Sequence, residues 1–347
     1  MDFGGGDEIR FDRQGKAGIV TLTRPKALNA VTHGMIRALD KALDAWADDA
    51  DIAVIVIKAE GRAFSAGGDI QHIYDAGKAG RPPIDFFADE YRLNAKIKRF
   101  KKPYVALIDG IVMGGGVGVS FHGSHRVMTE NAIFAMPEVG IGFFPDVGGS
   151  HMLPRLKGSF GMYLGLTGTR IRRGDACWSG LSTHSIDAAQ LPDLVDAIAE
   201  SGLPDEALKT FAVSAERETD EAMTHVIQKH FSLGTLDDVL TSLAQAAPLE
   251  PFTAKTLETM KTRSPTSLHV AFRQITDGAM LSMDECMQLE FRVVNRMLHG
   301  DDFYEGIRAV VIDKDNRPRW RPATLEEVDP NDIDRYFAPL DEGELSL

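Results

Sequence analysis

The sequence predicts an α/β core followed by a helical C-terminal region. Three short runs rich in valine and isoleucine, at 19–22, 53–57 and 104–108, are bounded by polar or turn residues and are typical of buried strands. Amphipathic stretches lie between these runs, and helical periodicity dominates the last part of the chain. Strands that alternate with helices favour a mostly buried sheet. We therefore expect a core region at 1–200, which carries the site discussed below, and a helical region at 201–347.

The stretch 32–50 predicts the first helix. Its apolar residues recur at helical spacing and are Met35, Ile36, Leu39, Leu43 and Trp46. Thr32 is a suitable N-cap because its hydroxyl can accept a hydrogen bond from a free N–H of the first turn. A glycine- and proline-containing stretch at 77–84 predicts a surface loop, followed by a second helix at about 83–99.

Composition and charge limit the classes of partner. The 347-residue chain has 38 lysine and arginine residues against 51 aspartate and glutamate residues, and its net charge of -13 makes nucleic acid an unexpected partner. Cys177 and Cys286 lie far apart, so neither a disulfide framework nor a cysteine-based metal site is expected. A reducing cytoplasm is inferred from this cysteine usage, and the acidic start of the chain at 1–8 differs from a secretory or transit peptide. No apolar run approaches the roughly 20 residues of a membrane span.

Two glycine-rich turns each follow a predicted strand. The first is 62–70, after the strand ending at Ile57, and the second is 110–118, after the strand ending at Ile108. Turns that lack bulky side chains and open a helix can aim backbone N–H groups at one point, where these donors bind a phosphate or a developing oxyanion. The structural alternative is that the glycines only let a helix pack on a strand. Two such turns together favour a site.

Two carboxylates, Glu138 and Asp146, lie in the apolar, glycine-rich segment 136–150, which has no basic residue. An apolar setting opposes ionisation, and each carboxylate also opposes ionisation of the other, so the pair can be poised for proton transfer near neutral pH. The alternative is that both acids cap helices or face water. Beside the two glycine turns, the pair indicates a catalytic site.

Other chemistries fit the sequence less well. Ser120 lies in a near match to a nucleophile elbow, but the second glycine comes one position late, so Ser120 is predicted to be a packing residue. His122 and His125 have no carboxylate at a spacing that completes a metal triad, and we interpret both as structural. A phosphate-loop motif is absent, and the carboxylate segment lacks the aromatic platforms expected of a glycosidase. No metal is expected.

The motif Phe-Ser-Ala-Gly-Gly-Asp at 64–69, together with the glycines at 114–116, resembles the crotonase, or enoyl-CoA hydratase/isomerase, superfamily. The resemblance implies an α/β fold built as a spiral of ββα units, here with a helical C-terminal region. It also implies binding of acyl-CoA, with the thioester oxygen held between two backbone N–H groups. By position these donors would be Ala66 and Gly115. Residues 24–30 resemble the early turn of the family, whose backbone lies along CoA.

The same resemblance implies a set of substrate-binding residues. They are Lys26, Leu28, Ala66, Gly67, Gly68, Asp69, Ile70, Gly114 and Gly118. Coenzyme A is part of the substrate in this family, so no separate cofactor is implied. Family members form trimers and larger assemblies, which implies a homo-oligomer, either a trimer or a hexamer.

The acidic residues distinguish the branches of the superfamily. Hydratases of the family place one glutamate shortly after the second glycine turn and another in a Pro-Glu loop. Glu138 supplies the second, but the position of the first is Gly118, and Asp146 stands where a hydratase carries glycine. This pattern resembles the 3-hydroxyisobutyryl-CoA hydrolase branch. Four C-terminal stretches extend the resemblance over nearly the whole chain: 264–268, 286–292, 302–309 and 313–322.

That branch implies hydrolysis of a short-chain 3-hydroxyacyl-CoA thioester, above all 3-hydroxyisobutyryl-CoA, to 3-hydroxyisobutyrate and CoA in valine catabolism. Ala66 and Gly115 would stabilise the oxyanion. Glu138 would activate a water as general base or attack directly to form an anhydride, and Asp146 would orient the water or the 3-hydroxyl group. The alternatives are an enoyl-CoA hydratase or isomerase of the same fold and a noncatalytic CoA-binding protein.

Overall fold

Two packing units interleave along the chain. The computed structural model describes residues 1–341 and 343–347. The first unit consists of Met1–Asp69, Asp89–Phe134 and Ile171–Glu218, and the second consists of Ile70–Ala88, Ala135–Arg170 and Thr219–Leu347. This division by packing differs in kind from the sequence-based division at residue 200, which stays a prediction.

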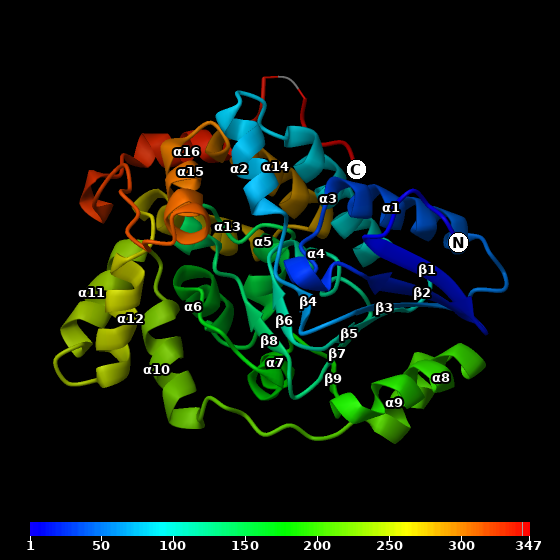
Figure 1. Cartoon of the computed structure of the whole chain (residues 1–347). Helices are drawn as coiled ribbons and strands as arrows, with labels where there is room; N and C mark the ends of the chain where they lie inside the picture. Colours follow the sequence, from blue (N-terminus) through cyan, green and yellow to red (C-terminus); the bar gives the residue numbers. More distant parts are fainter. Residues whose placement is uncertain (342) are drawn as a thin grey trace. The chain divides into compact units, whose positions relative to one another are not determined.

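A six-stranded sheet is the main sheet of the first unit (Figure 1). In spatial order its strands are β1 (Ile9–Gln14), β2 (Ala17–Leu22), β3 (Val54–Ala59), β5 (Tyr104–Ile108), β7 (His125–Met128) and β9 (His184–Ser185). β1 and β2 are antiparallel, and every following pair is parallel. The three strands predicted from the sequence are β2, β3 and β5. Every residue of β2 and β5 is buried, which is why these strands read as continuous apolar runs.

Two helices pack on this sheet, α8 (Leu191–Ser201) and α9 (Pro204–Phe211). Ile19, Val56 and Leu107 of the sheet share one apolar core with Leu194 and Ile198 of α8. Burying one such side chain stabilises the fold by about 1.5–3 kcal/mol. The core therefore fixes the strands from which the glycine turns depart.

A second, three-stranded sheet contains β4 (Ala63–Ser65), β6 (Ile111–Met113) and β8 (Ile133–Ala135). Each of these strands follows a strand of the main sheet in the chain, and the first two are followed by the helices α2 (Ile70–Lys78) and α4 (Gly115–Gly118). The order strand, strand, helix is the ββα repeat that the family resemblance implies. β4 and β6 pair in parallel, so the turns that follow them lie at the same edge of the sheet.

The predicted N-terminal helices are also present. α1 (His33–Ala47) matches the helix predicted at 32–50, and all five of its predicted apolar residues are buried. The Thr32 hydroxyl accepts a hydrogen bond from the Met35 N–H at 3.2 Å, so Thr32 is the N-cap. α3 (Ile84–Arg99) matches the second predicted helix. The remaining helical segments of the first unit are η1 (Pro25–Ala27), α7 (Arg173–Ser179) and η4 (Ala188–Gln190).

Helices dominate the second unit, as the periodicity of the C-terminal region predicts. The α-helices after α2 are α5 (Gly149–Met152), α6 (Phe160–Thr167), α10 (Glu221–Phe231), α11 (Leu236–Ala246), α12 (Pro251–Lys261), α13 (Pro265–Gly278), α14 (Met283–Met297), α15 (Asp301–Ile307) and α16 (Pro330–Phe337). The shorter turns are η2 (Glu138–Ile141), η3 (Leu153–Arg155), the π-helical η5 (Arg308–Ile312) and η6 (Leu325–Glu327). α11 and α12 lie side by side, and both α13 and α14 pack against α5 (Figure 1). No helix in the described part of the chain has the length and apolar character that a membrane crossing needs.

The start of α14 is fixed by a capping box. Ser282 Oγ accepts a hydrogen bond from the Glu285 N–H at 3.3 Å, and Glu285 Oε2 accepts one from the Ser282 N–H at 2.8 Å. Because a serine N-cap is worth about 1 kcal/mol relative to alanine, we expect Ser282→Ala to speed amide hydrogen exchange at Glu285 and Cys286. Met280→Ala, at a residue that is 90% exposed, serves as control and leaves exchange unchanged. Equal exchange in both variants would contradict the role of the cap.

Candidate active site

The two glycine turns meet in the first unit. A Cβ atom on Gly116 would lie 2.5 Å from Ser65 O, and one on Gly115 would lie 3.3 Å from Gly68 N. The first distance is shorter than any side chain tolerates, so the backbones of the two turns touch only because Gly116 has no side chain. The sequence predicts that two such turns act at one point, and the structure brings them together.

Gly67 and Gly114 supply a second requirement for glycine. Their φ angles are +120° and +46°, in the half of conformational space that side-chain-bearing residues rarely adopt. These conformations turn the chain sharply after β4 and β6. The structural alternative, in which glycine serves packing alone, therefore does not account for these two positions.

Ala66 is not placed to act as an oxyanion donor. Its N–H donates to Leu28 O at 3.0 Å, so this donor is already used within the chain. The N–H groups of Gly68 and Gly115 are better candidates, because neither has a hydrogen-bond acceptor in the described part of the chain. Gly115 is also the first residue of α4, where backbone N–H groups have no partner inside the helix. We therefore replace Ala66 by Gly68 in the proposed donor pair.

The segment at 24–30 is ordered against the first glycine turn. Leu28 and Asn29 both have φ near +50°, at 51° and 53°. The buried Asn29 amide donates to Glu60 O and to Ala63 O, each at 2.8 Å, and so stabilises this conformation. Lys26 is exposed on η1. The structure thus places Leu28 beside the turn and leaves the Lys26 ammonium in solvent, where it could meet a phosphate.

The other predicted substrate-binding residues differ in surroundings. Asp69 forms an ion pair with Arg24 at 3.1 Å, which ties the first glycine turn to the 24–30 segment. Gly118 is buried within α4, and Ile70 begins α2 in the second unit. Contacts of these residues with a substrate stay predictions.

Glu90 of α3 is a buried acid that the sequence analysis missed. It is 2% exposed, and its Oε1 lies 2.8 Å from the Cβ position of Gly115. An acid beside a proposed oxyanion donor can bind substrate or transfer a proton. The available signal was its helical spacing from the buried Phe87 and Asn94, but a charged residue on an amphipathic helix ordinarily faces solvent.

Glu138 and Asp146 are both buried in the second unit, at 5% and 4% exposure. Glu138 begins η2, and its backbone oxygen accepts a hydrogen bond from the Phe143 N–H at 3.0 Å. Within the described residues, Glu138 Oε2 has no hydrogen-bond partner. This burial excludes the alternative that the two acids face water.

Burial and a neighbouring charge set the protonation of Glu138. Burial raises its pKa well above the ordinary value, and the charge of Asp146 raises the pKa further. Glu290 of α14 contributes in the same direction, and a hydrogen bond from the backbone lowers the pKa. The opposition predicted from the apolar segment is therefore present at Glu138, whose pKa is raised by burial and by the charge of Asp146.

Ser120 and His125, which the sequence analysis interprets as packing or structural residues, form hydrogen bonds within the protein. Ser120 Oγ donates to Gly116 O at 2.6 Å. His125 lies between Ser124 Oγ at 2.9 Å and Asp205 Oδ1 at 3.0 Å. The described residues contain no group of three or more histidine, cysteine, aspartate or glutamate side chains that could hold a metal ion.

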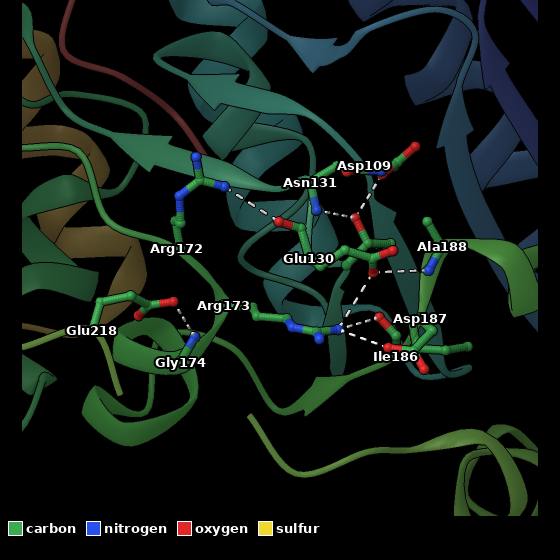
Figure 2. Close-up of polar contacts among 11 residues, drawn as sticks. Asp109, Glu130, Asn131, Arg172, Arg173, Gly174, Ile186, Asp187, Ala188 and Glu218 are labelled. Carbon is green, nitrogen blue, oxygen red and sulfur yellow. Dashed lines mark hydrogen bonds and ion pairs between the residues drawn. The ribbon is translucent and has the colours of Figure 1, made fainter. Parts of the chain in front are cut away.

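Figure 2 shows a separate polar network in the first unit. Arg173 Nη1 donates to Ile186 O at 2.9 Å and contacts Glu130 and Asp187 at 3.4 and 3.2 Å. Glu130 also accepts a hydrogen bond from the Ala188 N–H at 2.9 Å. The Glu130 and Asp187 side chains are 44% and 53% exposed, so these ion pairs contribute little energy. The network holds surface segments together and offers no catalytic arrangement.

Comparison with known proteins establishes the class. Residues 17–337 match the family described as enoyl-CoA hydratase/isomerase. The chain belongs to this family, whose enzymes act on acyl-CoA substrates. The crotonase-like α/β fold with a helical C-terminal region, as predicted, is thereby confirmed.

The individual relatives point to one reaction. A Danio rerio protein named 3-hydroxyisobutyryl-CoA hydrolase, mitochondrial, is 44% identical over 99% of this chain and 92% of its own length. Proteins of the same name from Gallus gallus and Homo sapiens are 44% and 39% identical, each over 98% of this chain and 91% of the relative. The resemblance to this branch is thus confirmed over almost the full length.

Two solved structures share the fold closely but carry other names. A carnitinyl-CoA dehydratase from Mycobacterium thermoresistibile has a TM-score of 0.92 and 38% identity over 98% of this chain and 99% of its own. An enoyl-CoA hydratase from Rhodobacter sphaeroides 2.4.1 has a TM-score of 0.91 and 38% identity over 98% and 100%. The fold is therefore common to proteins named for different reactions.

The cytoplasmic location inferred from the sequence is wrong. The hydrolase relatives are named as mitochondrial proteins. A low cysteine content argues only against an oxidising compartment and cannot distinguish between reducing ones. The inference therefore had no physical basis for choosing the cytoplasm.

The raised pKa of Glu138 has a consequence for stability. Its contribution is fully present below the ordinary glutamate pKa and is lost as the pH rises through the higher folded-state pKa. We expect Glu138→Gln to have a higher Tm than the parent at about pH 8, with the difference closing toward about pH 4. Thermal unfolding at both pH values measures this. A lower Tm for the variant at the higher pH would show that Glu138 ionises without penalty.

Proposed function

We propose that this chain hydrolyses 3-hydroxyisobutyryl-CoA to 3-hydroxyisobutyrate and CoA, a step of valine degradation. Relatives named for this activity are 39–44% identical over nearly the whole chain. The observation that carries the proposal is the placement of the acids. Glu138 and Asp146 are buried and electrostatically coupled, whereas Gly118, where hydratases of the family carry their first glutamate, has no side chain.

The first unit supplies the oxyanion donors in this proposal. The thioester carbonyl oxygen accepts hydrogen bonds from the N–H groups of Gly68 and Gly115, which stabilise the charge that develops on this oxygen. Loss of one such donor typically costs about 10²- to 10³-fold in rate. Support comes from the backbone approach of the two turns and from the absence of another acceptor for either N–H in the described residues. The turn residues and the 24–30 segment carry the CoA moiety.

The second unit supplies the acids in this proposal. In one route Glu138 takes a proton from water while the water oxygen bonds to the carbonyl carbon, and the C–S bond then breaks to release CoA thiolate. In the other route Glu138 attacks the carbon directly, CoA leaves, and water hydrolyses the resulting anhydride. Asp146 orients the water or the 3-hydroxyl group. The thiolate needs little acid assistance because a thiol is already fairly acidic. No cofactor takes part, since CoA belongs to the substrate.

An enoyl-CoA hydratase is the second candidate function. Two observations favour it: the names of the two structures that match at 38% identity, and the buried Glu90 beside Gly115. Glu90 gives the first unit an acid that a hydratase would need and that the sequence did not reveal. The hydrolase remains the better supported function. It alone explains both the acid at Asp146 and the relatives that are named as hydrolases.

The proposal also includes association of the chain with copies of itself. A homo-oligomer, either a trimer or a hexamer, is what the family resemblance implies, and light scattering on the purified chain measures the assembly size directly.

The two candidate functions differ in product. The expected outcome is release of free thiol from 3-hydroxyisobutyryl-CoA and 3-hydroxypropionyl-CoA, with crotonyl-CoA keeping its enoyl absorbance. Glu138→Gln should lower thiol release by about 10²- to 10⁴-fold, because it removes the group that acts on water or carbon. Loss of enoyl absorbance without thiol release would establish the hydratase instead.

A single turnover in oxygen-18 water separates the two hydrolytic routes. Hydrolysis of an anhydride leaves one labelled oxygen in the Glu138 carboxylate when water attacks the enzyme carbonyl, whereas the general-base route leaves the enzyme unlabelled. Mass spectrometry of the peptide containing Glu138 gives the result. We expect no label at Glu138, because Asp146 is proposed to orient a water for the general-base route. A labelled Glu138 peptide would establish the anhydride.

A further inference from the structure

Glu290 is a fully buried acid that the proposed reaction does not use. It lies on α14 at 0% exposure. Its Oε2 accepts a hydrogen bond from the Gly148 N–H at 2.9 Å, and its Oε1 accepts one from the Ser150 N–H at 3.0 Å and another from the Ser150 hydroxyl. All three donors belong to the segment that follows Asp146, at the turn and at the start of α5. Glu290 therefore holds the backbone on which Asp146 is carried, from a helix about 140 residues away in the chain.

The turn that Glu290 holds is not one the chain would adopt unaided. Val147 has φ of 49° and Gly148 has φ of 87°. A β-branched residue in the left-handed region is a genuine conformational outlier, which persists only when surrounding contacts determine it. Glu290 supplies such contacts immediately after Val147.

A second helix holds the other side of Asp146. Gln274 of α13 is fully buried, and its Nε2 donates to Pro145 O at 2.6 Å. Asp146 thus lies between two backbone positions that are fixed by buried polar side chains, Pro145 by Gln274 and Gly148 by Glu290. This arrangement restricts the direction in which the Asp146 side chain leaves the turn.

Burying a carboxylate costs free energy, so an acid is an unfavourable residue for a purely structural role. No cation is among the hydrogen-bond partners of Glu290 in the described part of the chain, and burial raises its pKa to about 8. The Gly148 N–H and Ser150 lower this pKa, while the charge of Asp146 raises it. A buried acid that has hydrogen bonds but no cation beside it is a candidate for a functional role.

We propose that Glu290 is a positioning residue for Asp146: by accepting the N–H groups of Gly148 and Ser150 it fixes the left-handed turn that aims the Asp146 carboxylate at the reacting water or the substrate hydroxyl. The inference rests on the proposed function, because it assigns Asp146 that role. It adds a residue that touches neither substrate nor reacting atoms and acts through the turn alone.

The test is a double-mutant cycle with thiol release from 3-hydroxyisobutyryl-CoA as readout. Glu290→Gln keeps the size of the side chain but places an amide donor against a backbone donor. We expect kcat to fall about 10- to 100-fold, as for other residues that orient a reacting group, with KM changed less than about 3-fold. In the Asp146→Asn background the same substitution should lower kcat less than about 3-fold, because the group it positions is gone.

Glu305→Gln is the matched control. Glu305 Oε1 also accepts a loop N–H, that of Arg319 at 2.8 Å, on α15 of the same unit. We expect this variant to keep kcat within about 2-fold in both backgrounds, whatever its effect on Tm. Equal losses in kcat from Glu290→Gln with and without Asp146 would overturn the positioning role while leaving the hydrolase assignment intact. Failure of the parent protein to release thiol would overturn the hydrolase assignment and this inference with it.

Ser150→Ala keeps the proposal testable if Glu290→Gln does not fold. It removes only the hydroxyl donor to Glu290 Oε1 and leaves both backbone bonds in place. The expected fall in kcat is smaller, about 2- to 10-fold, the effect of one hydrogen bond, and it should again vanish in the Asp146→Asn background. A loss that persists there would contradict the proposal.

Discussion

The parallel pairing of β4 with β6 is the constraint on which the candidate site of the first unit depends. Each strand ends at the same edge and turns sharply, so two backbones approach closely at Ser65 and Gly116. No side chain fits between them, and glycine becomes a geometric necessity. The same approach places Gly115 beside Gly68, so the element that requires glycine also brings the two proposed donors close together.

The second unit differs from the first, because its candidate site groups are buried acids. Glu138, Asp146 and Glu290 are all acids, and each of the two glutamates has its pKa raised by burial. Such groups oppose folding when they ionise, so the unit must compensate elsewhere, through the helical packing of α13 and α14 against α5. In the proposed function, this loss of stability follows from keeping carboxylates out of water for proton transfer. Apolar residues at these three positions would avoid the free energy of burying an acid, if packing alone determined the sequence.

Local patterns in the sequence predict much of this structure. β2, β3, β5, α1 and α3 follow from apolar runs, helical spacing and one N-cap, because these features involve neighbours in the chain. The acids Glu138 and Asp146 could also be identified, since their segment is apolar over many consecutive residues. The family motif located the two glycine turns that the structure brings together, and their role as oxyanion donors stays a prediction.

What the sequence could not supply depends on direction and on distant contacts. The motif does not reveal that the Ala66 N–H points to Leu28 O, which is why Gly68 replaces it only once hydrogen bonds are known. Glu90 and Glu290 lie on amphipathic helices, where a glutamate is expected to face water. Their burial is decided by turns far away in the chain, at Gly115 and at Gly148, and no local pattern records such a contact.

The ordered state of the 24–30 segment bears on how tightly and how fast a large ligand can be captured. A flexible loop must lose conformational entropy when it closes on a ligand, and that loss is subtracted from the binding free energy. Here Asn29 already holds the loop through Glu60 O and Ala63 O, and Leu28 O is engaged with Ala66. The 24–30 segment therefore loses its conformational entropy when the protein folds, before any ligand binds. A nucleotide-bearing ligand that lies along this loop therefore meets a preformed surface, and less of its binding free energy is lost in ordering the protein.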